Sequence, residues 1–264
     1  MSEVLGHAVA NRTDAKRWWK LRRFAWSSIA SVTLVAALGT TSASADTSGN
    51  SGTVELVIVE EAADGSLSIR TVPTTAANEI QIMAASRPDS TIISVEPQIE
   101  VRAFPNAATD PIEATSTNDA RRGSQWALDR INFESTWQTA SGTGIVVAVL
   151  DTGVLGTHED LVGRLLPGAD FVNGGGDGTV ADNPHGSHVS GIIGATAANI
   201  VGVAGGSPNV RILPVRVLNS NGSGTVSGVS NGIIWAIDNG ADIINLSLGT
   251  ATDSSTLRTA VAYA

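Results

Sequence analysis

The 264-residue chain contains no cysteine, so no disulfide bond can brace it. Aromatic residues make up only 4% and charged residues only 16%, whereas glycine contributes 28 residues. This composition favours an α/β or β protein with many tight turns over a helical bundle. An apolar fraction of 42% is typical of a packed globular core.

Positive charge is scarce beyond the N-terminal region. Of the 16 basic and 25 acidic residues, six basic and two acidic ones lie in residues 1–45, which leaves 10 basic and 23 acidic residues and a net charge of −13. A body this acidic repels phosphate groups, so no nucleic-acid partner is expected. The charge fits a soluble exported protein or one that binds cations.

Residues 1–45 resemble an export signal. A basic stretch over residues 16–23 precedes an apolar run over residues 27–39, and Ala43-Ser44-Ala45 is a small-x-small cleavage site. The apolar run is short for a bilayer span, so we expect a cleaved signal and a secreted, extracellular or periplasmic protein without a stable membrane span. A single anchoring helix is the alternative, and Arg22-Arg23 leaves twin-arginine export open.

Residues 46–104 form the next predicted unit. Its expected elements are strands over residues 54–59 and 67–72, a helix over residues 76–86 and a strand over residues 92–101. About 50 residues make only a marginal core, so this small α+β unit is expected to lean on a larger body, as a prosegment does. Residues 105–124, rich in Pro, Ala, Thr, Asn and Asp, are predicted to be a linker and the start of the mature chain.

Residues 125–264 are predicted to form an α/β domain. The continuous apolar run over residues 144–150 is typical of a strand buried on both faces. The expected order is strand 144–150, helix 187–198, strand 210–218, helix 226–239, strand 241–248 and a helix from residue 253. This alternation predicts a parallel, doubly wound sheet with an irregularity at Pro214. Because the sequence stops inside the last helix, we expect the sheet to be incomplete and the chain to be a fragment.

Two residues stand where catalytic groups gather in such folds. Asp151 directly follows the strand at residues 144–150, and His185 begins a predicted helix. The carboxyl ends of parallel strands share one crevice, so we expect the two side chains to meet there. A buried carboxylate that accepts from one imidazole nitrogen fixes the tautomer, and the other nitrogen can then take a proton from a nucleophile.

Over about residues 117–264 the chain resembles the subtilase family of serine proteases. The resemblance rests on VLDTGV around Asp151, on HGSHVSG beginning at His185 and on the segment 215–249. It implies a subtilisin-like fold and a secreted endopeptidase that hydrolyses peptide bonds of polypeptides. Asp151 would orient His185, His185 would act as general base and then general acid, and His188 would be a helix residue behind it.

The resemblance also implies a cleft and its partners. The prosegment would assist folding and block the cleft, whose walls would pair with an extended peptide as added strands. The implied wall residues are Gly222, Ser223, Gly224, Ser247, Leu248 and Gly249. The family's nucleophile motif and its oxyanion asparagine lie beyond residue 264, so the chain as given is expected to cut nothing.

A calcium site is the one cofactor that the resemblance implies. Asp119, Asp160 and Asn199 carry the hard oxygen atoms that calcium prefers. Such a site would also give a chain without disulfides another brace. The alternative is that each of the three is an ordinary surface turn residue.

Rival enzyme classes fit the motifs less well. Asp151-Thr152-Gly153 is also the aspartic-protease signature, but that mechanism needs two such aspartates and the chain has one. The G-x-S-x-G pattern around Ser230 would need a histidine later in the chain, so Ser230 is expected on a helix surface. His185 and His188 lack the spacing of zinc peptidases.

A non-catalytic alternative remains. The chain would then act as a fragment whose prosegment binds and inhibits a protease cleft. Arg121-Arg122 resembles a processing site, yet it lies inside the stretch that is similar to a mature N-terminus.

Overall fold

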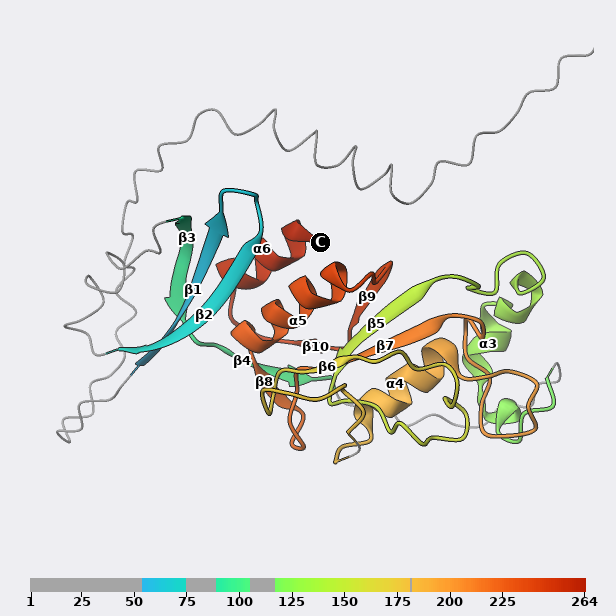
Figure 1. Ribbon diagram of the computed structural model, residues 1–264. Coiled ribbons are helices and arrows are strands. Elements are labelled where there is room, and N and C mark those ends of the chain that lie inside the picture. The colour runs from blue at the N-terminus through green and yellow to red at the C-terminus, as the bar shows by residue number, and fades with distance from the viewer. Residues whose placement is uncertain (1–53, 75–88, 105–116, 181) are drawn as a thin grey trace, which may run out of the picture. The chain divides into compact units, whose positions relative to one another are not determined.

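The computed structural model describes residues 54–74, 89–104, 117–180 and 182–264 (Figure 1). The predicted signal at residues 1–45 and the predicted helix at residues 76–86 lie outside these ranges. No helix within the described ranges is long and apolar enough to cross a bilayer.

The described chain forms three small sheets and several helices. A four-stranded parallel sheet has the order β6-β7-β5-β9, and two antiparallel sheets have the orders β2-β1-β3 and β10-β4-β8. The strands are β1 Val54–Ala62, β2 Leu67–Thr74, β3 Ser90–Pro97, β4 Glu100–Ala103, β5 Val146–Asp151, β6 Ala169–Asp170, β7 Arg211–Arg216, β8 Ser223–Thr225, β9 Ile243–Leu246 and β10 Leu248–Gly249. The helices are the short η1 Arg122–Ser124 and η2 Phe133–Thr136, then α3 Trp126–Arg130, α4 His185–Gly194, α5 Val226–Asp238 and α6 Ser255–Tyr263.

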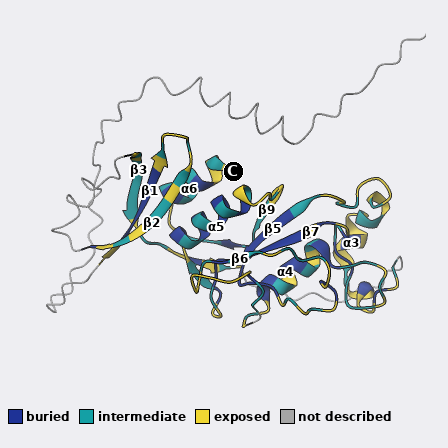
Figure 2. Ribbon diagram, in the orientation of Figure 1, coloured by how far each residue is buried: buried dark blue, intermediate teal, exposed yellow. Residues whose placement is uncertain are grey.

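Helices cover both faces of the parallel sheet because alternate residues of β5 point to opposite sides. Ala148 and Leu150 are buried in one cluster with the apolar residues of α5, whereas Val147 and Val149 are buried in another with Val189 of α4. Buried residues therefore run through β5 and β7 between the helices (Figure 2). The mixed α/β fold with a parallel sheet, predicted from the sequence, is present.

Pro214 lies in the middle of β7, a strand that continues through it. Its neighbours Ile212 and Arg216 make backbone hydrogen bonds toward the β6 side, to Arg164 and from Phe171. The missing N–H of Pro214 points to the same side, where β6 has only two residues and the ladder is interrupted. The predicted irregularity thus lies in the neighbouring strand.

The strand expected over residues 92–101 is two strands in different sheets. β3 pairs with β1, and the chain then passes Gln98 and Ile99 before β4 pairs with β8 and β10. Gln98 explains the break, because its side chain accepts from Ser227 N and donates to Ser227 Oγ at the start of α5. The predicted strand 241–248 is likewise divided into β9 and β10.

The β1–β3 sheet packs on α5 and α6. Glu96 of β3 accepts hydrogen bonds from the backbone N–H groups of Ser255 and Thr256 and from the hydroxyl of Ser254, at the beginning of α6. Burial acts to raise the pKa of Glu96, but these hydrogen bonds outweigh it and lower the pKa. A carboxylate from the N-terminal unit therefore satisfies the free amide groups that every helix leaves at its N-terminus.

Arg122 is buried rather than accessible, which contradicts its interpretation as a processing site. Its guanidinium donates to Glu134 at 2.5 Å and to Asp129 at 2.7 Å. The hydrogen bond to Glu134 is the main cause that raises the pKa of Arg122. A protease would have to break this cluster before it could reach the bond between Arg121 and Arg122.

Candidate active site

Asp151 is the last residue of β5, and it is fully buried. Its Oδ1 accepts a hydrogen bond of 2.7 Å from Thr152 N, which fixes the orientation of the carboxylate. Its backbone oxygen accepts from Val217 N and Leu218 N, just after β7. The end of the sheet therefore holds Asp151 from both its side chain and its main chain.

His185 is the first residue of α4 and is 8% exposed. Its backbone N–H donates to Asn183 Oδ1 at 2.9 Å, and Asn183 Nδ2 donates to Ser220 O. The hydroxyl of Thr152 accepts from Gly186 N and donates to Asn183 O. The turn before α4 is thus tied to the residue that follows Asp151.

The predicted contact between Asp151 and His185 is present. His185 Nδ1 lies 2.7 Å from Asp151 Oδ1 and 2.9 Å from Oδ2. A carboxylate here requires Nδ1 to carry a proton, so any proton exchange with a reacting group would go through Nε2.

Glycine at position 186 permits this approach. A Cβ at Gly186 would overlap Gly153 O and would lie 3.1 Å from Asp151 Oδ1. The backbone of α4 therefore comes closer to the end of β5 than any other residue type would allow.

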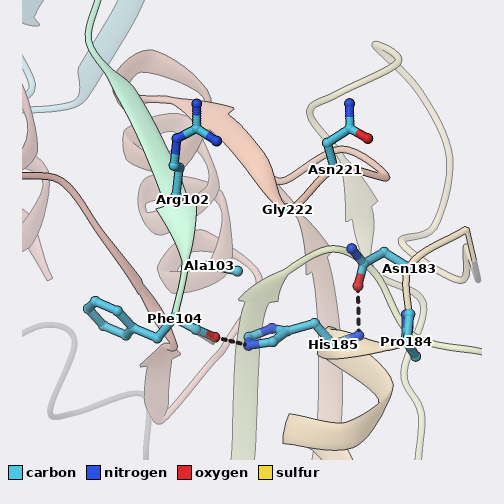
Figure 3. Close-up of a pocket in the computed structure, with 8 residues that line it drawn as sticks. All are labelled: Arg102, Ala103, Phe104, Asn183, Pro184, His185, Asn221 and Gly222. Atoms are coloured by element: carbon cyan, nitrogen blue, oxygen red, sulfur yellow. Dashed lines mark hydrogen bonds between the residues drawn. The ribbon is translucent and has the colours of Figure 1, made fainter. Parts of the chain in front are cut away.

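A peptide segment of the chain lies across this pair. His185 Nε2 is 2.8 Å from the carbonyl oxygen of Phe104, the residue that follows β4 (Figure 3). Phe104 and His185 border a hollow of about 300 Å³, with Gly222 and Asn221 on its other side. A carbonyl oxygen can only accept, so this contact needs a proton on Nε2, and the segment after β4 occupies the imidazole nitrogen that Asp151 leaves open.

All six predicted cleft residues contact this segment. β4 lies between β8 and β10 as the middle strand of an antiparallel sheet. Arg102 is paired with Ser223 and Gly249, Val101 with Gly224, and Ala103 with Leu248. Ala103 N donates to Gly222 O and Phe104 N donates to Ser247 O. β4 is thus added as a strand between the edges of β8 and β10, as an extended peptide is in β-strand addition.

The three predicted calcium ligands also lie together, but their oxygens meet N–H donors. Asp119 accepts from the backbone N–H groups of Ala198 and Asn199, and Asp160 accepts from Val203 N and from Asn199 Nδ2. The oxygen of Asn199 accepts from Val201 N. Calcium needs six to eight converging oxygen atoms, and Asn199 presents a nitrogen to Asp160. The arrangement therefore does not fit a calcium ion and forms a clasp without one.

We expect EDTA to leave the Tm of the chain unchanged, because the carboxylates of this clasp already have donors. Asp160→Ala should lower Tm by roughly 4 °C or more, since it leaves buried N–H groups without acceptors. Differential scanning calorimetry with and without EDTA measures both effects. Glu159→Gln, at the exposed neighbouring residue, is the control, and a fall in Tm on adding EDTA to the unmodified chain would contradict the expectation.

The rival motifs take other places. Ser230 lies in the middle of α5 and is fully buried, so its expected place on the helix surface was wrong. It follows Val226 by four residues and precedes Ile233 by three, which puts it on the buried face of the helix. His188 is exposed on α4 and lines a second hollow, away from Asp151. The described residues contain no group of three or more His, Cys, Asp or Glu side chains that could hold a metal ion.

Sequence reasoning missed three residues that shape the site. Thr152 and Asn183 connect Asp151 to His185, and Arg216 makes ion pairs beside them. A charged residue directly between Val215 and Val217 was the signal for Arg216, since an unpaired buried charge is costly. Thr152 and Asn183 gave no such signal.

Comparison with known proteins gives concordant matches. Residues 142–264 match the family described as "Subtilase family". The chain is 45% identical over 144 residues to "Thermophilic serine proteinase" of Bacillus sp. (strain AK1), which covers 54% of this chain and 36% of that protein. It is 44% identical over 141 residues to "Thermitase" of Thermoactinomyces vulgaris, covering 53% of this chain and 50% of that protein.

A solved structure of a protease from Pseudoalteromonas arctica gives a similar match. It aligns with a TM-score of 0.50 and 36% identity, over 56% of this chain and 55% of that one. The chain thus spans about half or less of the length of the curated relatives named above.

Proposed function

Residues 142–264 belong to the subtilase family, and from this premise we propose that the chain carries the Asp–His part of a serine endopeptidase. The observation that carries the proposal is the contact of Asp151 with His185. The second nitrogen of His185 lies beside the carbonyl oxygen of Phe104, the residue that follows β4. The substrate is a polypeptide, bound in extended form between β8 and β10.

In the proposed reaction, His185 Nε2 takes the hydroxyl proton of a serine while the serine oxygen attacks the peptide carbonyl carbon. Asp151 stabilises the imidazolium that forms. His185 then gives the proton to the leaving amine nitrogen as the C–N bond breaks, and water repeats the sequence on the acyl-enzyme. In this proposal the serine belongs to a part of the protease that follows residue 264.

The experiment that tests the function supplies the missing part. We expect residues 117–264, joined to the part of thermitase that follows the matched region, to hydrolyse casein, and the 264-residue chain alone to hydrolyse none. Serine-directed reagents should stop the hydrolysis, whereas inhibitors of aspartic proteases should not. Circular dichroism establishes that the chimera is folded, and a folded chimera without activity would contradict the proposal.

A second function is favoured by the position of β4. We propose that residues 54–104 form an inhibitory prosegment, with β4 as the strand that fills the cleft. Support comes from the pairing of β4 with β8 and β10 and from the contacts of Glu96 and Gln98 with α6 and α5. Export through residues 1–45 stays a prediction, because those residues lie outside the described ranges.

A further inference from the structure

Arg216 is a buried cation at the C-terminal end of β7, one of the two inner strands of the parallel sheet. It is the last residue of β7, and it stands in register with Asp151 of β5 on one side and Asp170 of β6 on the other. Its side chain is only 3% exposed. A buried guanidinium without a partner would strongly destabilise the fold. The partners of Arg216 therefore show which segments it connects.

The first partner of Arg216 is a rigid one. Asp170, itself 2% exposed, accepts from Arg216 Nη1 at 3.1 Å. Asp170 also accepts from the backbone N–H groups of Val172 and Asn173. Burial acts to raise the pKa of Asp170, but the hydrogen bonds from Asn173, Val172 and Arg216 outweigh it and lower the pKa. Asp170 therefore stays charged and fixes one end of the guanidinium.

The second partner lies three residues before His185. Arg216 Nη2 donates to Asp182 Oδ2 at 2.6 Å, and Asp182 is 41% exposed. The next residue, Asn183, accepts from the backbone N–H of His185. The two Nη atoms of Arg216 thus connect the buried Asp170 in the sheet to Asp182 in the turn before α4.

We propose that Arg216 is a positioning residue, which holds Asp182 and through it the turn of residues 182–185, so that the imidazole of His185 faces Asp151. The inference deepens the proposed function and rests on it. Arg216 touches neither Asp151 nor the substrate segment through any described hydrogen bond, so it acts through the turn and not on the reaction itself.

The test follows the Nδ1 proton of His185 by NMR in the 264-residue chain labelled with ¹⁵N-histidine. A hydrogen bond to Asp151 gives this proton a low-field resonance, which His185→Ala identifies by its loss. In Asp182→Ala we expect the proton to exchange with water about ten-fold faster or more, the size expected for losing a charge-assisted hydrogen bond. Tm should change little, because Asp182 is partly exposed and Asp170 keeps its partner.

Asp177→Ala is the matched control. It removes the same charge from the same segment, but within the described ranges the Asp177 side chain bonds only to Thr179, so the exchange rate should equal that of the unmodified chain. Arg216→Lys should keep part of the protection and Arg216→Met should lose it. Because Arg216→Met leaves Asp170 buried without its cation and threatens the fold, Asp182→Ala decides the question.

The outcomes separate the two proposals. Equal exchange rates in Asp182→Ala, Asp177→Ala and the unmodified chain would overturn the positioning role and leave the proposed function intact. A low-field resonance missing from the unmodified chain would contradict the Asp151–His185 pair, and with it both proposals. Faster exchange in Asp182→Ala alone supports the role of Arg216.

Discussion

Asp151→Asn is expected to lower kcat of the thermitase chimera by about 10⁴-fold, the loss typical of this substitution in serine proteases. Asp151 Oδ1 accepts from Thr152 N, so the asparagine oxygen will take that position. The amide nitrogen then lies where Oδ2 is, beside His185 Nδ1. An amide N–H there opposes a proton on Nδ1 and favours the tautomer that carries the ring proton on Nε2, which removes the general base.

Kinetics on a short peptide substrate measure this effect, and KM should change little because Asp151 makes no contact with β4 in the described structure. Asp242→Asn is the matched control. Asp242 accepts from Val146 N at the opposite end of β5 and is exposed, so its loss should leave kcat within a few-fold. Retention of more than about one hundredth of the activity by a folded Asp151→Asn enzyme would refute the role given to the pair.

The second large effect concerns the inhibitory segment. We expect the peptide of residues 51–104 to slow peptide hydrolysis by thermitase at micromolar concentrations, and Val101→Asp to weaken that inhibition by about 100-fold or more. Val101 is fully buried in β4, in the same hydrophobic cluster as Leu218 and Leu248. A carboxylate without a partner in such a place costs about 3 kcal/mol or more, which corresponds to this factor.

The inhibition constants of the two peptides measure the difference. Arg102→Asp introduces the same side chain at the next residue of β4, whose side chain is 68% exposed and forms its ion pair with the exposed Glu100. It should therefore change the inhibition constant much less. No inhibition by the unmodified peptide at micromolar levels, or equal effects of the two substitutions, would count against the cleft-filling role of β4.

The sequence was most informative where a residue pattern is typical of one kind of secondary structure. The apolar, β-branched run before Asp151 indicated a buried strand, and alternation of strands and helices then brought Asp151 and His185 to one edge of the sheet. Contacts that no motif or strand pattern marks were not predictable in this way. The partners of Arg216 lie 34 and 46 residues away, and nothing in their local sequence indicates that they meet.

The division of one predicted strand and the geometry around Asp119 and Asp160 both have local causes. The division of the expected strand 92–101 follows from Gln98, whose partner in α5 is 129 residues distant. The clasp around Asp119 and Asp160 was predicted to be a calcium site on its residue types alone. Its backbone amides turn inward through positive φ angles at Ala198 and Ile200, which only Gly or Asn would have signalled in the sequence.

The carboxylate of Glu96 joins the beginning of α6 across 159 residues of chain. While the chain is continuous, the carboxylate of Glu96 stays close to α6. The backbone N–H groups at the beginning of that helix then have their acceptor at any protein concentration. If the backbone were cut between residues 104 and 117, the same contact would become an encounter of two molecules. The order of the first turn of α6 would then depend on dilution, so a freshly severed protein would loosen at this helix as its N-terminal piece diffuses away.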